Sequence, residues 1–147
     1  MSADSRDARL GEFAETLIRC VRDPAIASCD ALLSGGMKGT DGERWAEHAL
    51  NPAVKDALQA LLPDIVDRTL YTMLDAIDNG LIPLAWAQTT GECGLLQEIG
   101  DSEMAGWLLG QGGWVSRFSS ERWHDPAPGV KLVREWPSVP RRGRGEP

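Results

Sequence analysis

The sequence is poor in cysteine and has no apolar run long enough to cross a membrane. Cys20, Cys29 and Cys93 are its only cysteines and form no CxxC pair, so we expect free thiols in a reducing compartment. No stretch of about 18 apolar residues occurs, and the N-terminal residues lack the apolar segment of a secretory signal. Together these absences predict a cytoplasmic protein with no membrane partner.

The short motifs that mark common enzyme families are absent as well. The chain contains no GxSxG, HExxH or GxGxxG sequence. The glycine-rich stretch 34–42 includes Lys38 but lacks the spacing of a phosphate-binding loop, and it follows a predicted helix. Cys93 with His48 or His124 as its base fits no recognisable catalytic signature. The sequence therefore favours a protein that is not an enzyme and needs no cofactor.

Basic residues are outnumbered, which bears on the partner. The 147 residues are 42% hydrophobic and 25% charged, values typical of a globular chain, and their net charge is -7. Three of the arginines follow Pro140, so the residues before them carry a net charge of about -9. Nucleic acid is bound by clustered Lys and Arg, so this charge argues against it and favours a basic protein.

Apolar residues recur at helical spacing over most of the chain. The sequence therefore predicts a mainly α fold, a compact bundle of about five to six helices with a small β-hairpin or irregular flap and an extended C-terminal tail. We expect residues 1–125 to form a single helical domain and the Pro- and Arg-rich residues 126–147 to form a flexible tail, with a short strand at 130–133. Helices are expected over 7–22 and 24–33, from Thr40, over 52–79, 103–110 and 114–123, and the hairpin within 81–100.

Proline marks three of the predicted helix boundaries. Asp23-Pro24 and Asn51-Pro52 each resemble an N-cap residue followed by proline in the first turn. Pro63 falls inside an apolar pattern that keeps its phase on both sides, so we expect one kinked helix across it. Trp45 is expected to point inward from the helix that begins at Thr40.

The segment 62–80 is the most clearly two-sided part of the chain. Its predicted core side contains Leu62, Ile65, Val66, Thr69, Leu70, Met73 and Ile77. The opposite side, the predicted acidic stripe, contains Asp64, Asp67, Arg68, Tyr71, Asp75 and Asp78. The stripe is predicted to be the binding surface, together with Trp123.

The same aspartates allow a second interpretation. Asp64 with Asp67, and Asp75 with Asp78, form two DxxD pairs, and paired carboxylates can hold Mg²⁺ or Mn²⁺ with the help of substrate phosphates. The chain would then be a small metal-dependent hydrolase of a phosphorylated substrate, with Lys38 or Arg44 holding phosphate. A solvated or protein-contacting face is the simpler interpretation, because a metal site draws its ligands from more than one helix.

Tryptophan is the dominant aromatic residue, with six copies against one Tyr and two Phe. Trp107 and Trp114 are predicted to fill the core, whereas Trp123 is predicted to lie at a surface. A third possibility is a small-molecule-binding accessory subunit with a Trp-lined pocket beneath the hairpin.

The preferred hypothesis is a non-enzymatic protein-binding domain. Bacterial immunity proteins, antitoxins and adaptor subunits are similar in type, because they too are small, acidic and without catalytic residues. In this hypothesis the stripe binds a basic protein, such as a toxin nuclease, and a homodimer remains possible.

Overall fold

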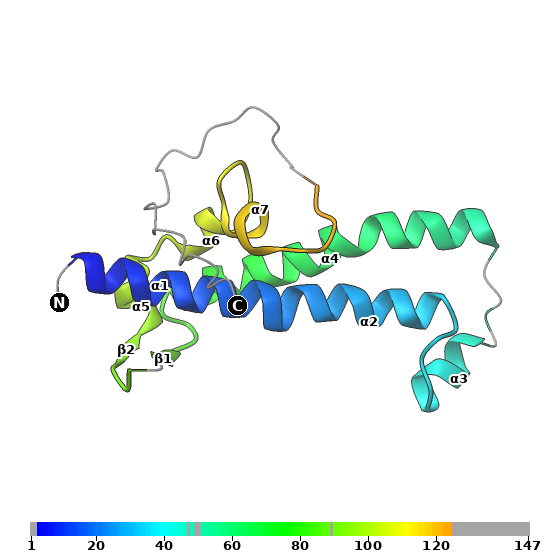
Figure 1. Ribbon diagram of the computed structural model, residues 1–147, viewed down its shortest axis with the longest axis horizontal. Coiled ribbons are helices and arrows are strands. Elements are labelled where there is room, and N and C mark those ends of the chain that lie inside the picture. The colour runs from blue at the N-terminus through cyan, green and yellow to red at the C-terminus, as the bar shows by residue number, and fades with distance from the viewer. Residues whose placement is uncertain (1–2, 47, 49–50, 89, 125–147) are drawn as a thin grey trace, which may run out of the picture.

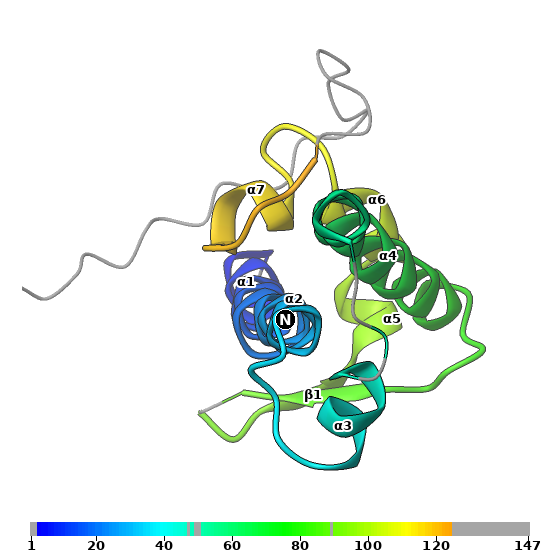
Figure 2. The same cartoon turned by 90° about the vertical axis from the view of Figure 1, so that its right-hand side faces the viewer.

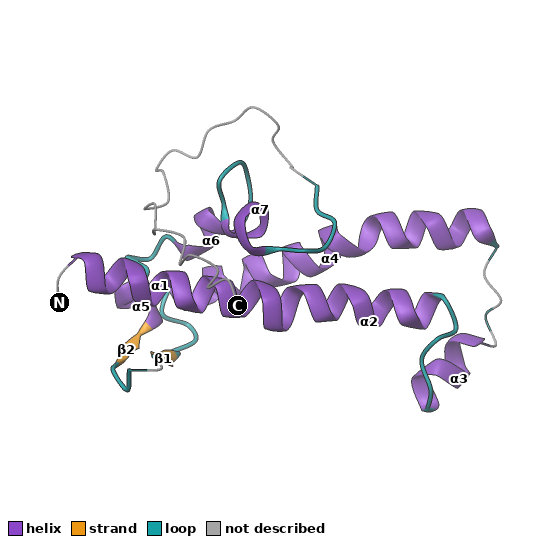
Figure 3. Cartoon of the chain, in the orientation of Figure 1, coloured by secondary structure: helices purple, strands orange, loops and turns teal. Residues whose placement is uncertain are grey.

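The computed structural model describes residues 3–46, 48, 51–88 and 90–124. These residues are mainly helical, with one two-stranded antiparallel hairpin, as predicted (Figure 1, Figure 3). If the unbroken run from residue 3 to 33 is counted once, the described residues form six helical units. The predicted tail from Pro126 and the strand at 130–133 lie outside the described residues.

The first helical unit is a long rod that does not stop at Asp23. α1 (Ala3–Leu17), the π-helical η1 (Ile18–Arg22) and α2 (Asp23–Leu33) follow one another without a gap, so the N-cap predicted at Asp23 is wrong. Pro24 offers no N–H and crowds the carbonyl four residues earlier. The wider π turn, in which the Asp23 N–H donates to the Ile18 carbonyl, accommodates that proline within the helix.

The π turn also adds one residue to a helical turn, so it shifts by one position which side chains of the helix face the interior. Val21, which continued the apolar pattern of the predicted first helix, is therefore exposed, and Arg22 takes the inward position.

A second rod, α4 (Pro52–Asp78), runs antiparallel beside the first (Figure 1). Its start is as predicted, since the Asn51 side chain accepts a hydrogen bond from the Ala53 N–H at 2.9 Å. Pro63 lies inside the helix, which confirms one continuous helix across it. α3 (Thr40–Ala46) joins the rods at the end away from the core, and Trp45 is 38% exposed there rather than inward.

The hairpin predicted within 81–100 is confirmed as β1 (Ala85–Ala87) paired with β2 (Cys93–Leu95), with Trp86 opposite Gly94. Trp86 meets Phe13 of α1 edge-on, with ring centroids 5.3 Å apart. Gly94 lies close to both neighbours, since a Cβ there would be 2.8 Å from Arg9 Nη1 and 3.0 Å from Ile99 Cδ1, and a larger residue would require both side chains to shift. The hairpin therefore packs directly on α1.

Three short helices complete the fold: α5 (Leu96–Ile99), α6 (Met104–Leu108) and α7 (Trp114–Phe118). The predicted helix over 114–123 is too long, because it ends at Phe118 and residues 119–124 are not helical. We call residues 119–124 the strap. End-on, α7 and the hairpin lie on opposite sides of the two rods (Figure 2).

The hydrophobic core lies at the α1 end of the rods. It is built from α1 and η1, the second half of α4, and α5, α6 and α7. Its buried members are Leu10, Phe13, Ala14, Leu17, Ile18, Leu70, Leu74, Ile77, Leu96, Ile99, Met104, Ala105, Trp107, Leu108, Trp114 and Val115. Trp107 and Trp114 are thus buried as predicted, and the first half of α4 projects beyond the core.

Candidate binding face on α4 and the buried arginine cluster

Four of the six residues of the acidic stripe are exposed along one side of α4. Asp64, Arg68, Tyr71 and Asp75 are all exposed, and their spacing of four, three and four residues keeps them in line on a helix. Because α4 is a 27-residue helix anchored in the core, it holds these side chains on a rigid surface. We call this side, together with the exposed Val54, Leu61 and Ile65, the outer face of α4.

Asp67 and Asp78 do not belong to this surface, and the prediction that they face solvent is wrong. They are only 4% and 6% exposed. α4 packs against both η1 and α6, so its buried arc is wider than that of a helix with one neighbour. Both aspartates lie at the edge of this arc, where each meets a specific donor from another element.

The outer face is also more apolar than predicted. Leu61 is 47% exposed and Ile65 is 50% exposed, although Ile65 was assigned to the core side. Leu74, which was not assigned to that side, is fully buried. The packed side of α4 is therefore rotated away from Ile65 and Thr69 and towards Asp67 and Leu74. The outer face therefore combines exposed apolar side chains with charged ones.

Arg22 occupies the centre of the interface between the rods and is fully buried. Its Nε and Nη2 donate to the two carboxylate oxygens of Asp67 at 2.5 and 3.0 Å. Nη1 donates to Asp23 Oδ1 and to the Ser119 hydroxyl, and Nη2 also donates to the Arg122 carbonyl. All five N–H donors of the guanidinium are thus used, which is what makes a buried arginine tolerable.

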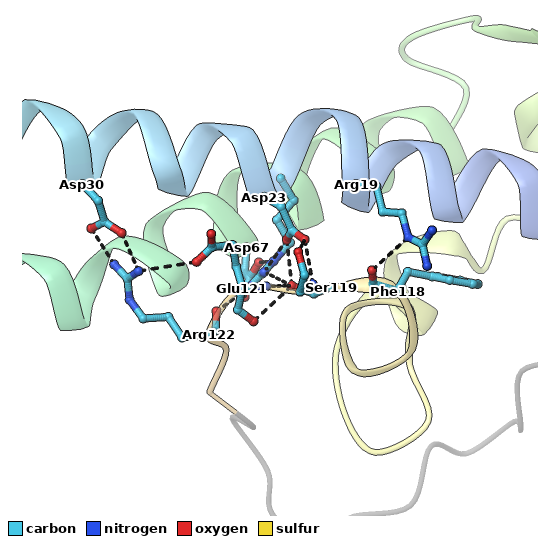
Figure 4. Close-up of polar contacts among 10 residues, drawn as sticks. Arg19, Asp23, Asp30, Asp67, Phe118, Ser119, Glu121 and Arg122 are labelled. Carbon is cyan, nitrogen blue, oxygen red and sulfur yellow. Dashed lines mark hydrogen bonds and ion pairs between the residues drawn. The ribbon is translucent and has the colours of Figure 1, made fainter. Parts of the chain in front are cut away.

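Asp23 binds the strap to the rod. Its carboxylate accepts hydrogen bonds from the Ser119 hydroxyl at 2.7 Å and from the Ser120 N–H at 2.8 Å (Figure 4). Burial alone would raise the pKa of Asp23, but the hydrogen bonds from Ser119, Ser120 and Arg22 outweigh it and hold that pKa below its usual value. Asp23 therefore stabilises the fold above its unfolded-state pKa, and this contribution is lost as the pH falls through its folded-state pKa.

The strap continues across to α4. Arg122 forms a two-point pair with Asp30 of α2 at 2.6 and 2.8 Å (Figure 4). It also donates to the Gln59 carbonyl of α4. His124 Nδ1 lies 3.2 Å from Asp64 Oδ1. Trp123, predicted to be a surface binding residue, is half-buried and packs against the core cluster. The strap is thus a structural element that ends beside the outer face of α4.

Asp78 stabilises the start of α6, because its Oδ2 accepts the Ala105 N–H at 2.8 Å. Its Oδ1 is buried with no hydrogen-bond partner among the described residues. Burial raises the pKa of Asp78, and backbone hydrogen bonds from Ala105 and Met104 only partly offset this.

Because the pKa of Asp78 is raised, Asp78→Asn is expected to increase the stability of the fold in a pH-dependent way. Asp78 binds its proton more tightly folded than unfolded, so it stabilises the fold below the unfolded-state pKa, and that contribution is lost as the pH rises through the folded-state pKa. Asn keeps an oxygen for the Ala105 N–H and cannot ionise. Urea unfolding should show the variant gaining stability relative to wild type as the pH rises from about 4 to about 7. The exposed Asp56→Asn serves as the control, and an equal difference at both pH values for Asp78→Asn would contradict the prediction.

The four aspartates of the proposed metal site do not come together. Asp67 is paired with Arg22, and Asp78 bonds to α6. Asp64 and Asp75 are eleven residues apart, or about 16 Å along the helix, so no single ion can bridge them. No group of three or more His, Cys, Asp or Glu within the described parts of the chain is arranged to hold a metal ion.

The three residues considered for thiol catalysis, Cys93, His48 and His124, lie in separate places. Cys93 is exposed on β2, His124 contacts Asp64 at the strap, and the His48 ring lies 6.1 Å from that of Trp45. A Trp-lined pocket beneath the hairpin was the third possibility, and there Trp86 of β1 packs edge-on against Phe13 of α1.

An open pocket of about 460 Å³ lies at the far end of the rods. The residues that line it are Leu32, Leu33, Ser34, Gly35, Trp45, Ala46, His48, Pro52, Lys55 and Asp56. Trp45 and His48 are both exposed there, and the pocket is broad and shared between α2, α3 and α4. It presents no buried charged side chain that would orient a ligand.

Comparison with known proteins gives no family: no protein-family model, no curated protein and no solved structure matches this chain. Within the parts of the chain that are described, no helix has both the length and the apolar character needed to cross a membrane.

Proposed function

We propose that this chain is a non-enzymatic protein-binding domain that docks a basic protein on the outer face of α4. The observation that carries the proposal is the exposed line of Asp64, Arg68, Tyr71 and Asp75, with Leu61 and Ile65 beside it. Half-exposed apolar side chains supply contact area, and a tyrosine supplies an anchor of the kind common in binding hot spots. The rigid helix holds these groups in place before a partner arrives, which lowers the entropic cost of binding.

The charge of the chain supports a basic partner. A net charge of -7 attracts positively charged proteins over long distances and speeds their encounter. Asp64 and Asp75 place part of that charge on the docking surface itself. In this proposal the chain acts in the cytoplasm as an acidic inhibitor of the immunity or antitoxin type, or as an adaptor.

A charge reversal at Asp75 tests the proposal. Protein captured from its own host at low salt and analysed by native mass spectrometry should carry a basic protein in a fixed ratio. We expect Asp75→Lys to weaken this complex about tenfold at low salt, and the difference from wild type to shrink as added salt screens the charges. Lys suits the last turn of α4, where the helix dipole favours a cation, so the fold should be retained.

Glu98→Lys is the matched control, because Glu98 is exposed on α5 and its reversal changes the net charge equally. Tyr71→Ala should also weaken the complex, and unlike Asp75→Lys it should do so at all salt concentrations. A partner that binds Asp75→Lys and Tyr71→Ala as tightly as wild type would rule out the outer face as the docking surface. If the wild-type chain captured from its host at low salt retains no basic protein, the proposal is wrong.

A further inference from the structure

The outer face of α4 has a regular seam along its length. Counting from Val54, residues spaced alternately by three and four fall in one line, and all of them are exposed. The members of this seam are Val54, Ala57, Leu61, Asp64, Arg68, Tyr71 and Asp75. This is the heptad spacing that lets two helices pack along a shared seam. It runs for about 32 Å, at 1.5 Å per residue.

One charge on the seam has no counterpart among the residues that the structure describes. The exposed Arg68 side chain forms no ion pair or hydrogen bond with the other described residues. Asp64, four residues earlier, has one polar side-chain contact within the described part of the chain, with His124 at the end of the strap. The two opposite charges therefore stand on the same line of the same helix without neutralising each other.

A two-fold axis at the level of Val66 would pair these charges reciprocally. In an antiparallel pair of helices, residues equally far from the axis lie level with each other, since each residue adds the same rise. Asp64 then faces Arg68 of the second copy, and Arg68 faces its Asp64. By the same count Leu61 faces Tyr71 in both directions, and Ile65 lies close to the axis. This is the self-complementary pattern that a two-fold interface requires.

We propose that a second copy of this chain docks on the outer face of α4, antiparallel, with two Asp64–Arg68 pairs across the interface. Four apolar side chains, Leu61 and Ile65 from each copy, are covered in the contact. The seam is a single helix face, so the buried interface is small and the dimer forms only at higher protein concentration. Reciprocal charge pairing fixes its antiparallel register, because the parallel arrangement would place like charges side by side.

This inference does not depend on the basic partner. The two surfaces overlap, so a second copy and a basic protein exclude one another from α4. Asp75 lies at the end of the seam, level with Ala57 of the second copy, and takes no part in the reciprocal charge pairs. The Asp75→Lys experiment above and the dimer experiment below therefore report on different contacts.

The test is sedimentation velocity of the purified full chain from about 1 to 500 µM, the range expected for a weak interface. Wild type should shift from monomer to dimer. In the Asp64→Arg dimer each Asp64–Arg68 pair is replaced by two facing arginines, and in the Arg68→Asp dimer by two facing aspartates. Each variant should therefore dimerise at least tenfold more weakly than wild type. Glu98→Lys should behave as wild type, and circular dichroism should show unchanged helix content for all variants.

Mixing the two single variants gives the decisive result. One chain then carries arginine at both positions and the other aspartate at both, so the mixture should restore dimers that neither variant forms alone. The double variant Asp64→Arg with Arg68→Asp should likewise restore its own dimer. A change of folding within one chain cannot produce rescue by mixing. A wild type that stays monomeric throughout, or a mixture that stays monomeric, would overturn the inference and leave the Asp75 test of partner binding intact.

Discussion

Arg22→Ala is expected to lower the free energy of unfolding by about 3–5 kcal/mol. The guanidinium is the shared donor for Asp67, Asp23, Ser119 and the Arg122 carbonyl. Its removal leaves the buried Asp67 carboxylate without a cation and loosens the strap at both ends. Breaking one side of a buried ion pair is costly because the remaining charge keeps its desolvation penalty.

Urea unfolding followed by circular dichroism measures this loss, and Arg19→Ala is the matched control. Arg19 is three residues earlier on the same π segment, but its side chain is exposed and pairs with Glu15 at the surface. Such pairs contribute little, so less than about 1 kcal/mol should be lost. Arg22→Met combined with Asp67→Leu should recover part of the stability by removing both charges. Equal losses of unfolding free energy for Arg22→Ala and Arg19→Ala would show that the hydrogen bonds of Arg22 do not hold the rods together.

Trp114→Ala is expected to destabilise the protein by a similar amount, about 3–5 kcal/mol. Trp114 is fully buried at the start of α7, with its ring 6.0 Å from that of Phe13 and 6.5 Å from that of Trp107. Truncation leaves a cavity where α1, α6 and α7 meet, and these rigid neighbours cannot close it. Because α7 precedes the strap, the strap should also lose contact with Asp23 at lower urea concentration.

Trp45→Ala provides the comparison for the same chemical change at a half-exposed site. Trp45 projects from α3 beyond the core, so its truncation should cost less than about 1 kcal/mol. Circular dichroism should be the readout, since tryptophan fluorescence changes with the substitution itself. Similar losses at Trp114 and Trp45 would mean that the core does not centre on Trp114.

The features that were predicted correctly from the sequence are those with local causes. The start of α4 follows from Asn51 and Pro52, whose effects act within one helical turn. The hairpin follows from turn residues and apolar runs that lie within 20 residues of each other. The mainly helical fold follows from apolar spacing. Each of these signals lies within a short window of the sequence.

The errors share a different cause, which is contact between distant segments. The π turn shifts the helix by one residue and exchanges Val21 for Arg22 on the packed side. Once Arg22 points inward, Asp67 is drawn to the interior as its partner. The spacing of α4 by itself could not reveal this, because Arg22 lies 45 residues away. An arginine directly after an apolar pattern, before Asp-Pro, was the one available signal.

The partners of Arg22 are synthesised at different times, which sets an order in which its hydrogen bonds can form. Arg22 and Asp23 leave the ribosome early, and Asp67 follows 45 residues after Arg22. Ser119 and Arg122 follow 97 and 100 residues after Arg22. The two rods can pair as soon as α4 has emerged, whereas the last donors and acceptors of the cluster are still unmade. A chain released before Ser119 would therefore leave Asp23 without its serine partners. Among the hydrogen-bonding partners of Arg22 and Asp23, those in the strap are therefore synthesised last.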